Sequence, residues 1–467
     1  MELSVYDHYS ESDILWVGQY PSHWNLTRVK YEAYVKARVG WHGLKSDDFT
    51  DEGPYLVTGS DFKGPRIRWS DCYHCDLKRY EQDPYIQLTN GDLLITKDGT
   101  IGKVALVDGL GDDEKATLNS GVFVVRPLRD NFLTKFYFWL LQSRVFTDFV
   151  NYNKTGSTIV HLYQDTFVNF AYASPDIAEQ TQIANFLDHE TTKIDTLIEK
   201  QQQLIKLLKE KRQAVISHAV TKGLNPQAPM KDSGVEWLGE VPEHWVVSPI
   251  KHLLRQKKGA VKAGPFGSHL KNSDMDGGDV KVITQKNVIK KNLSIGDSFI
   301  SEQKYRELSG FTIEKEDVLI TTRGTIGRTC VYSDEAVAIL HPCLIRMQCD
   351  ETKVIPELLA LIIQDSGYAM EQILVKSNAT TIEVIYSDNL VNTEICVPKT
   401  IDEQVRLLEF VELETDKFDS LVRKAESAIS LMQERRTALI SAAVTGKIDV
   451  RNWQAPTSEN QALEQTA

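Results

Sequence analysis

The sequence predicts an α+β protein in which two similar globular domains are each followed by a long α-helix. Two observations carry this prediction. The chain contains an internal repeat with an offset of about 224 residues, and each copy ends in a stretch whose apolar residues recur at helical spacing. At 467 residues, of which 42% are apolar, the chain is long enough for more than one hydrophobic core.

The repeat is visible along most of the chain. Residues 16–24 (WVGQYPSHW) return as residues 237–245 (WLGEVPEHW). Residues 92–103, a strand-like run followed by a glycine-containing loop, return in similar form as residues 317–328. This many matches in one order indicate that the chain arose by duplication.

The repeat and the breaks in pattern divide the chain into seven segments. We expect a leader (1–15), a first globular domain (16–174), a long helix (175–223), a linker (224–241), a second globular domain (242–397), a second long helix (398–447) and a C-terminal tail (448–467). Because the first copy begins behind a short leader that corresponds to the linker, we expect the two ends of the chain to lie near one another.

The two long helices, expected over residues 176–222 and 402–445, carry a seven-residue apolar repeat with charged and Gln residues between. Such a repeat is typical of a coiled-coil seam. The predicted seam, which is also the predicted partner-docking element, consists of Ile183, Leu187, Ile194, Leu197, Leu204, Leu208 and Val215 in the first helix, and Leu407, Val411, Phe418, Leu421, Ala428, Met432 and Leu439 in the second.

Each globular domain is also expected to contain one shorter helix, at Leu133–Val150 and Glu357–Val375. The first is rich in aromatic residues, which can either stack on nucleic-acid bases or pack in a core. We favour core packing for Phe136, Tyr137, Phe138, Trp139, Phe146 and Phe149.

The net charge of −12 argues against a nucleic-acid partner, but it hides an asymmetry. Residues 251–330 contain 15 Lys and Arg against 9 Asp and Glu. Local fields rather than the total charge attract DNA, although chance clustering on a solvated surface gives the same count.

Motifs for catalysis are not evident. The sequence lacks the phosphate-binding GxxxxGK[ST] loop, a GxGxxG turn, a GxSxG elbow and an HExxH helix. Six scattered cysteines suggest a reducing, cytoplasmic setting, and Cys72 and Cys75 are better explained as ordinary thiols than as half of a zinc site. We therefore expect a binding protein without catalytic residues and without a bound metal.

The repeated motifs resemble those of the specificity subunit of type I restriction-modification systems. The resemblance covers nearly the whole chain and rests on residues 237–245, 179–187 (EQTQIANFL), 193–198 (KIDTLI) and 211–217 (KRQAVIS), in this order and duplicated. It implies two target-recognition domains related by a pseudo-twofold axis, and two long helices, the conserved spacer regions of the family, that form an antiparallel coiled coil.

The resemblance also implies partners. These would be double-stranded DNA, two methyltransferase subunits and restriction-translocase subunits, with no membrane. S-adenosylmethionine and ATP with Mg²⁺ would be bound by the partner subunits, and no cofactor by this chain. The chain would read an asymmetric, bipartite target and direct adenine methylation or cleavage by its partners.

Candidate DNA contacts follow from residue type and expected loop position, because Arg, Lys and Asn reach phosphates and base edges. The glycines near the loop cations either let the backbone approach DNA or simply form a hairpin turn. The candidates are Arg38, Trp41, His42, Lys45, Lys63, Lys97 and Lys103 in the first domain, and Lys262, Phe266, Ser268, Lys271, Lys286, Asn287, Arg323 and Arg328 in the second.

One alternative remains open at this stage. The chain could be a coiled-coil scaffold that joins partner proteins through its globular domains without reading DNA. The basic segment and the duplicated loops with Lys or Arg argue against that alternative.

Overall fold

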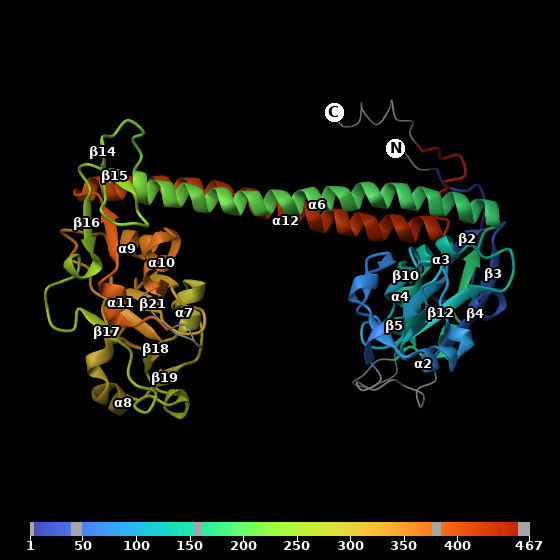
Figure 1. The fold of residues 1–467 in the computed structure, drawn as a ribbon, viewed down its shortest axis with the longest axis horizontal. Helices are drawn as coiled ribbons and strands as arrows, with labels where there is room; N and C mark the ends of the chain where they lie inside the picture. The colour runs from blue at the N-terminus through green and yellow to red at the C-terminus, as the bar shows by residue number, and fades with distance from the viewer. Residues whose placement is uncertain (1–3, 39–48, 154–160, 376–383, 456–467) are drawn as a thin grey trace. The chain divides into compact units, whose positions relative to one another are not determined.

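The structure, a computed structural model, divides into two compact units (Figure 1). Unit 1 comprises residues 1–201 and 427–467, and unit 2 comprises residues 202–426. The division passes through both long helices, so each unit contains part of each. The structure describes residues 4–38, 49–153, 161–375 and 384–455.

The globular part of unit 1 is built on a six-stranded sheet of order β4-β12-β9-β10-β7-β6, antiparallel except for the β10–β7 pair. A second sheet has the order β11-β5-β8, and two strand pairs, β1–β2 and β13–β3, stand outside these sheets. The strands are β1 (Tyr9–Glu11), β2 (Gln19–Pro21), β3 (Asn25–Arg28), β4 (Ala33–Ala37), β5 (Phe49–Val57), β6 (Phe62–Lys63), β7 (Arg66–Ile67), β8 (Tyr73–Cys75), β9 (Leu93–Thr96), β10 (Val104–Leu106), β11 (Ala116–Leu118), β12 (Val122–Pro127) and β13 (Ala171–Ser174).

Unit 2 repeats this plan with two four-stranded sheets, β17-β24-β21-β22 and β19-β18-β23-β20. Its outlying pairs β14–β15 and β16–β25 correspond to β1–β2 and β3–β13 of unit 1. The strands are β14 (Met230–Asp232), β15 (Glu240–Pro242), β16 (Val246–Pro249), β17 (Val261–Ala263), β18 (Val280–Ile283), β19 (Phe299–Ile300), β20 (Thr312–Ile313), β21 (Val318–Thr321), β22 (Thr329–Val331), β23 (Ala338–Leu340), β24 (Leu344–Met347) and β25 (Glu394–Val397).

Short helices pack on these sheets, and the sequence prediction of one helix in each domain is wrong in both. Each is broken into two, at Ser143 in unit 1, whose hydroxyl donates to the Leu140 carbonyl, and at Gly367 in unit 2, which has a positive φ of 83°. The predicted core role of the six aromatic side chains is confirmed, since all are buried. The short helices are α1 (Val29–Glu32), α2 (Leu77–Glu81), α3 (Thr134–Leu140), α4 (Arg144–Tyr152), α5 (Gln164–Phe167), α7 (Gln285–Lys290), α8 (Glu302–Glu307), α9 (Pro356–Asp365), α10 (Tyr368–Val375) and α11 (Ser387–Val391).

Within the described stretches, no single helix is long and apolar enough to cross a membrane. The apolar helices α9 and α10 are bent by 68° relative to one another. Their side chains Leu358, Ile362 and Ile373 are buried in the core of unit 2.

The two long helices are α6 (Ile177–Lys222) and α12 (Ile401–Val444), as predicted. In unit 1, Ile183 and Leu187 of α6 share a core with Ile440 and Val444 of α12. In unit 2, the core contains the C-terminal part of α6 and the N-terminal part of α12. The helices therefore pair antiparallel within each unit (Figure 1).

The predicted seam is confirmed only in part. Leu197, Leu204 and Leu421 are exposed, whereas Ile198 and Val422 are buried in their place. In α6 the consecutive buried seam residues are Leu187, Thr191, Ile194 and Ile198. Thr191 is polar, and its hydroxyl donates to the Leu187 carbonyl, so a pattern of apolar residues alone does not reveal this position and places Leu197 in the seam instead of Ile198. The predicted seam residues that are buried are Ile183, Leu187, Ile194, Leu407, Val411 and Phe418; Leu208, Val215, Ala428, Met432 and Leu439 are half-buried.

Two ion pairs, one in each unit, join the helices at positions related by the repeat. In unit 1, Arg436 Nε donates to Asp195 Oδ1 at 2.9 Å. In unit 2, Arg212 Nε lies 3.1 Å from Asp419 Oδ1. Since the side chains are only partly covered, each pair adds little stability, but together they distinguish this helix register from shifted ones.

The repeated WxGxxPxHW motif holds the first turn of each long helix. In unit 1, the Trp24 indole N–H and the His23 ring bond the two carboxylate oxygens of Glu179, at 3.2 and 2.8 Å. In unit 2, Trp245 and His244 bond Glu403 in the same way.

The ends of the described chain meet in unit 1. The Asp449 N–H donates to the Ser4 carbonyl at 2.7 Å, and the Tyr9 hydroxyl donates to the Gly446 carbonyl at 2.9 Å. The expectation that the two ends lie near one another is thus confirmed for residues 4–9 and 446–451.

The corrected seam makes a direct prediction. Ile198→Asp should lower the free energy of unfolding by about 3–5 kcal/mol, because it buries an unpaired charge. Its neighbour Leu197→Asp, half exposed at 50%, should change it by no more than about 0.5 kcal/mol. Urea unfolding followed by helical circular dichroism measures both, and equal losses in the two variants would contradict the seam.

Candidate nucleic-acid interface

Each unit gathers loops at one edge of its sheets. In unit 1, the Lys97 N–H donates to the Gly121 carbonyl, and the Leu162 N–H donates to the Lys97 carbonyl, both at 2.9 Å. In unit 2, Thr322 likewise receives a bond from the Ile385 N–H and donates to the Cys343 carbonyl. We call these regions the loop edges: residues 58–60, 97–99, 119–121 and 161–163 in unit 1, and 284–286, 322–324, 341–343 and 385–386 in unit 2.

The loop that follows β9 in unit 1 and β21 in unit 2, which we call the central loop, is held by the same hydrogen bonds in both units. The hydroxyls of Thr96 and Thr321, at the ends of β9 and β21, donate across the loop to the carbonyls of Thr100 and Thr325. The N–H groups of Lys103 and Arg328 then donate back to those hydroxyls at 2.9 Å. The glycines within these loops have positive φ, so the turn itself accounts for them.

The strands that carry these loops are fixed at their other ends by equivalent ion pairs. Arg126 donates to both oxygens of Asp92 at 2.7 Å, and Arg346 donates to Asp317 at 3.1 Å. Burial raises the pKa of Asp317, while Arg346 acts in the opposite direction. The loops therefore stand on strands whose register is held by buried polar contacts.

Two candidate residues are wrong, because their side chains are buried and form hydrogen bonds inside the protein. Asn287 is 1% exposed, accepts from the Thr284 N–H at 2.9 Å and donates to the Ile295 carbonyl at 2.7 Å, so its amide is used inside the protein. Asp61 holds Thr58 in the same way. Arg38 is 2% exposed and donates to the Leu118 carbonyl. Neither Asn287 nor Arg38 can reach DNA in this conformation.

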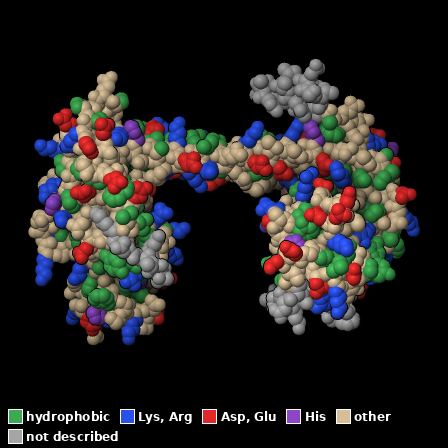
Figure 2. All heavy atoms as spheres, in the orientation of Figure 1, with side chains coloured by type: hydrophobic (Ala, Val, Ile, Leu, Met, Phe, Trp, Pro, Cys, Tyr) green, Lys and Arg blue, Asp and Glu red, His purple; other side chains and the backbone are tan. Residues whose placement is uncertain are grey.

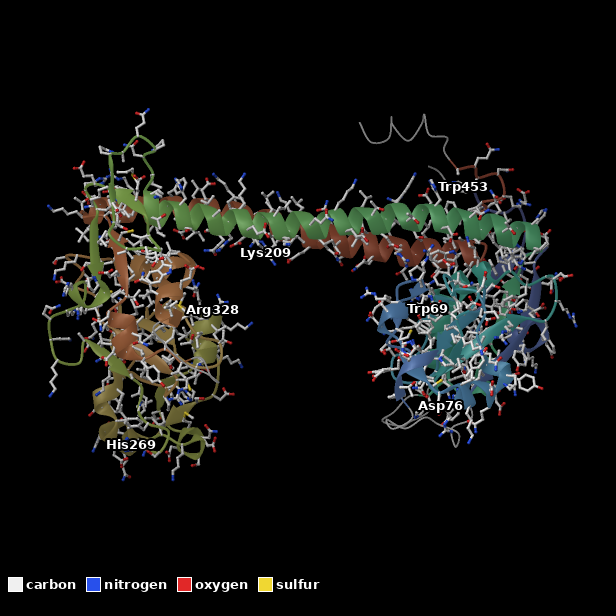
Figure 3. All side chains as sticks on the ribbon, viewed as in Figure 1. Trp69, Asp76, Lys209, His269, Arg328 and Trp453 are labelled. Atoms are coloured by element: carbon white, nitrogen blue, oxygen red, sulfur yellow. The ribbon has the colours of Figure 1, made fainter. Side chains whose placement is uncertain are left out.

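The remaining candidates of unit 2 are exposed, except Lys262, which is half-buried. The side chains of Lys286 and Arg323 belong to neighbouring loops, because the Gln285 amide donates to the Arg323 carbonyl. Lys262 Nζ lies 4.7 Å from the centre of the Phe311 ring. Arg328 projects from the surface, and His269 marks the end of unit 2 farthest from the long helices (Figure 3). The exposed residues near His269 are Phe266, Ser268 and Lys271.

Among the residues described, fewer candidate cations of unit 1 are exposed at its edge. Lys97 is half-buried, with Nζ 5.6 Å from the centre of the Phe123 ring and 4.0 Å from Asp98. Lys103 and Lys63 are exposed, the latter on edge strand β6. Trp41, His42 and Lys45 lie outside the described residues.

The charged side chains do not form one large basic surface on the visible face, where Lys and Arg are interspersed with Asp and Glu (Figure 2). At the loop edge of unit 2, burial lowers the pKa of His341, so this ring is uncharged at neutral pH.

Three exposed or polar groups at the edges are not among the residues predicted from the sequence. Tyr163 and Tyr386 extend from equivalent positions, and His161 Nδ1 lies 2.6 Å from Asp98 Oδ1. The repeat itself would have singled out the tyrosines, since both copies carry Tyr there.

The two cysteines considered as half of a metal site are buried. The Cys72 thiol donates weakly to the Arg68 carbonyl at 3.6 Å, and burial raises its pKa to about 12. Burial also raises the pKa of Cys75. Among the described residues, no group of three or more His, Cys, Asp or Glu side chains is placed to hold a metal ion.

Comparison with known proteins gives one consistent result. Residues 44–207 and 242–425 match the family model described as the type I restriction modification DNA specificity domain. The chain is 22% identical to the type I restriction enzyme EcoBI specificity subunit of Escherichia coli over 377 residues, which is 78% of this chain and 75% of that protein. It is 27% identical over 169 residues to a putative type I restriction enzyme specificity subunit of Haemophilus influenzae, covering 36% and 40% of the two chains.

Solved structures show a similar fold, and one of them aligns over most of both chains. It was reported in work on complex assembly and conformational transition of the type I R-M system. It aligns with a TM-score of 0.65 at 15% identity, over 91% of this chain and 98% of that chain.

The different surroundings of neighbouring residues Lys286 and Asn287 predict different effects on stability. Asn287→Ala should lower the free energy of unfolding by at least about 2 kcal/mol, because it leaves buried backbone groups without partners. Lys286→Ala, on the exposed side, should change it by no more than about 0.5 kcal/mol. Thermal unfolding measures both; an Asn287→Ala protein as stable as wild type would show that the turn does not need this amide.

Proposed function

Because the chain belongs to the family of type I restriction-modification specificity subunits, we propose that it reads an asymmetric, bipartite DNA target and directs adenine methylation or cleavage by partner subunits. In this proposal, each unit reads one half-site with its loop edge. The chain performs no catalysis and binds no cofactor. S-adenosylmethionine, ATP and Mg²⁺ are bound by the partner methyltransferase and restriction-translocase subunits.

One observation carries the proposal: the two loop edges have the same backbone scaffold but different outward side chains. Thr96 and Thr321 hold the central loop alike, yet the same loop position is Asp98 in unit 1 and Arg323 in unit 2. Arg pairs with guanine, whereas a carboxylate accepts a bond from cytosine. Two such edges favour different half-sites, which makes the target asymmetric.

A second turn of each edge shows the same division. Thr58 and Thr284 are held by Asp61 and Asn287, while the outward residue is Ser60 in unit 1 and Lys286 in unit 2. Lys reaches phosphates and guanine edges, and Ser bonds several bases. A shared scaffold with varied side chains supports a reading function rather than a purely structural one.

We further propose that the partner subunits dock on leucines that the helix pair leaves exposed. Leu197 and Leu421 occupy equivalent positions of the repeat, and so do Leu207 and Leu431. Large apolar side chains exposed at equivalent places indicate an interaction surface. Because the surface is duplicated, it suits two copies of one partner, as expected of two methyltransferase subunits.

The reading proposal is tested by exchanging the recognition part of unit 2. The Ile250 N–H donates to the Thr393 carbonyl at 3.0 Å, so residues 250–393 begin and end at one hydrogen bond and leave β16 and β25 in place. Replacing them with the matching segment of a relative of different specificity should change one half of the methylated motif and keep the other. Methylome sequencing of the host detects this, and a change in both halves or in neither would contradict modular reading. A complex that assembles without methylating any motif would favour the scaffold alternative.

The docking proposal has its own test. Leu197→Asp together with Leu421→Asp should lower the amount of methyltransferase subunit that co-purifies at least about tenfold, since two charges enter apolar contacts. The helical circular-dichroism signal should stay unchanged, because both side chains are exposed. Lys209→Ala, another exposed position on α6, serves as the control. Unchanged co-purification with the double variant would show that the partner docks elsewhere.

A further inference from the structure

A short motif beside the loop edges occurs in both units. Residues 163–169 (YQDTFVN) correspond to residues 386–392 (YSDNLVN), with identical Tyr, Asp, Val and Asn. The motif contains the whole of helix α5 in unit 1 and of α11 in unit 2, with the tyrosine directly before the helix and the asparagine after it.

The terminal asparagine of the motif has an evident structural role. Asn169 donates to the Asp165 carbonyl at 2.7 Å and accepts from Lys30 at 2.9 Å. In unit 2, Asn392 makes the same contact to the Asp388 carbonyl and also accepts from a lysine. Retention of the asparagine in both copies is thus explained by the fold.

The tyrosines have no such explanation. Their carbonyls accept from the N–H groups of Phe167 and Leu390, which any residue type can do. The side chains of Tyr163 and Tyr386 are 68% and 57% exposed. Among the residues that the structure describes, neither hydroxyl has a hydrogen-bond partner. The Tyr163 ring lies 6.2 Å from the His161 ring, centre to centre. An exposed tyrosine that is kept in both copies, with no partner for its hydroxyl, indicates a shared external contact.

The tyrosines are tied to the central loops. The residue before each one, Leu162 or Ile385, donates its N–H to the carbonyl of Lys97 or Thr322, at 2.9 and 3.0 Å. Each tyrosine therefore directly follows a residue that is bonded to the loop whose outward side chain differs between the units, Asp98 in one and Arg323 in the other. A ligand that contacts this loop is within reach of the tyrosine.

We propose that Tyr163 and Tyr386 bind the sugar-phosphate backbone of DNA and position each unit on its half-site. This inference rests on the proposed reading function. Half-sites of different sequence share the backbone and not the base edges, so a residue kept in both readers suits the shared part. A tyrosine hydroxyl donates to a phosphate oxygen, and its neutral ring covers the sugar without releasing a counterion.

The test uses the complete complex with its methyltransferase partner. DNA duplexes carry either the motif that methylome sequencing identifies or a scrambled sequence. Tyr163→Phe and Tyr386→Phe remove only the hydroxyl, and Tyr31→Phe is the control, because Tyr31 is exposed but corresponds to His252 in the repeat. Binding is measured at several salt concentrations.

Each of the two variants should weaken binding to both duplexes by the same factor, about 3- to 10-fold, which is the range for one hydrogen bond. The specificity ratio should not change. The slope of log affinity against log salt should also not change, because no charge is removed, whereas Arg323→Ala should make it shallower if that side chain meets a phosphate.

Three results would overturn the inference. A changed specificity ratio would identify a base contact, loss of the partner subunit would identify a protein contact, and binding equal to that of the control would leave the hydroxyls without a DNA role. If the wild-type complex itself does not prefer the motif, the reading function fails instead, so the two failures are distinguishable.

Discussion

The core of each unit is closed by two helices that come from distant parts of the sequence, and the rest of the structure depends on this constraint. In unit 1, the sheet residues Leu93 and Phe123 share one core with Leu187 of α6 and Ile440 of α12. Unit 2 is built in the same way, with Ile216 of α6 and Leu407 of α12 in its core. Each long helix thus contributes one half to each unit. Loss of helix pairing would expose the sheets of both, since burial of apolar surface is the main stabilising contribution.

Apolar contacts alone do not fix how such long helices align, because a shift by seven residues restores most of the seam. Polar contacts make the difference. Asp195 meets Arg436, and Arg212 meets Asp419, at positions that the repeat relates to one another. At the helix starts, Glu179 and Glu403 are held by the indole and imidazole groups of the preceding motif. A shifted register would separate the two ion pairs between the helices, so these pairs specify an alignment that they do little to stabilise.

The sequence was most informative where a physical pattern was long. The repeat and the two helices could be predicted because dozens of residues obey one period. The seam phase could not, since Thr191 interrupts the apolar pattern at a buried position. Arg38 and Asn287 look like DNA contacts by residue type, but whether a polar side chain turns inward depends on distant carbonyls such as that of Leu118. The tyrosines of the loop edges were recoverable in principle, because they are identical in the two copies.

The same comparison of copies explains how a protein of this design can change its target without losing its fold. At each loop edge the side chains that hold the backbone, Thr96 and Thr321 or Asp61 and Asn287, are used inside the unit. The outward positions between them make few internal contacts, so substitutions there cost little stability. Asp98 is the exception, because His161 lies 2.6 Å from its carboxylate. A substitution of Asp98 would leave the His161 ring without this partner. The edge of unit 1 is therefore harder to alter at this position than the edge of unit 2 at Arg323, which is exposed.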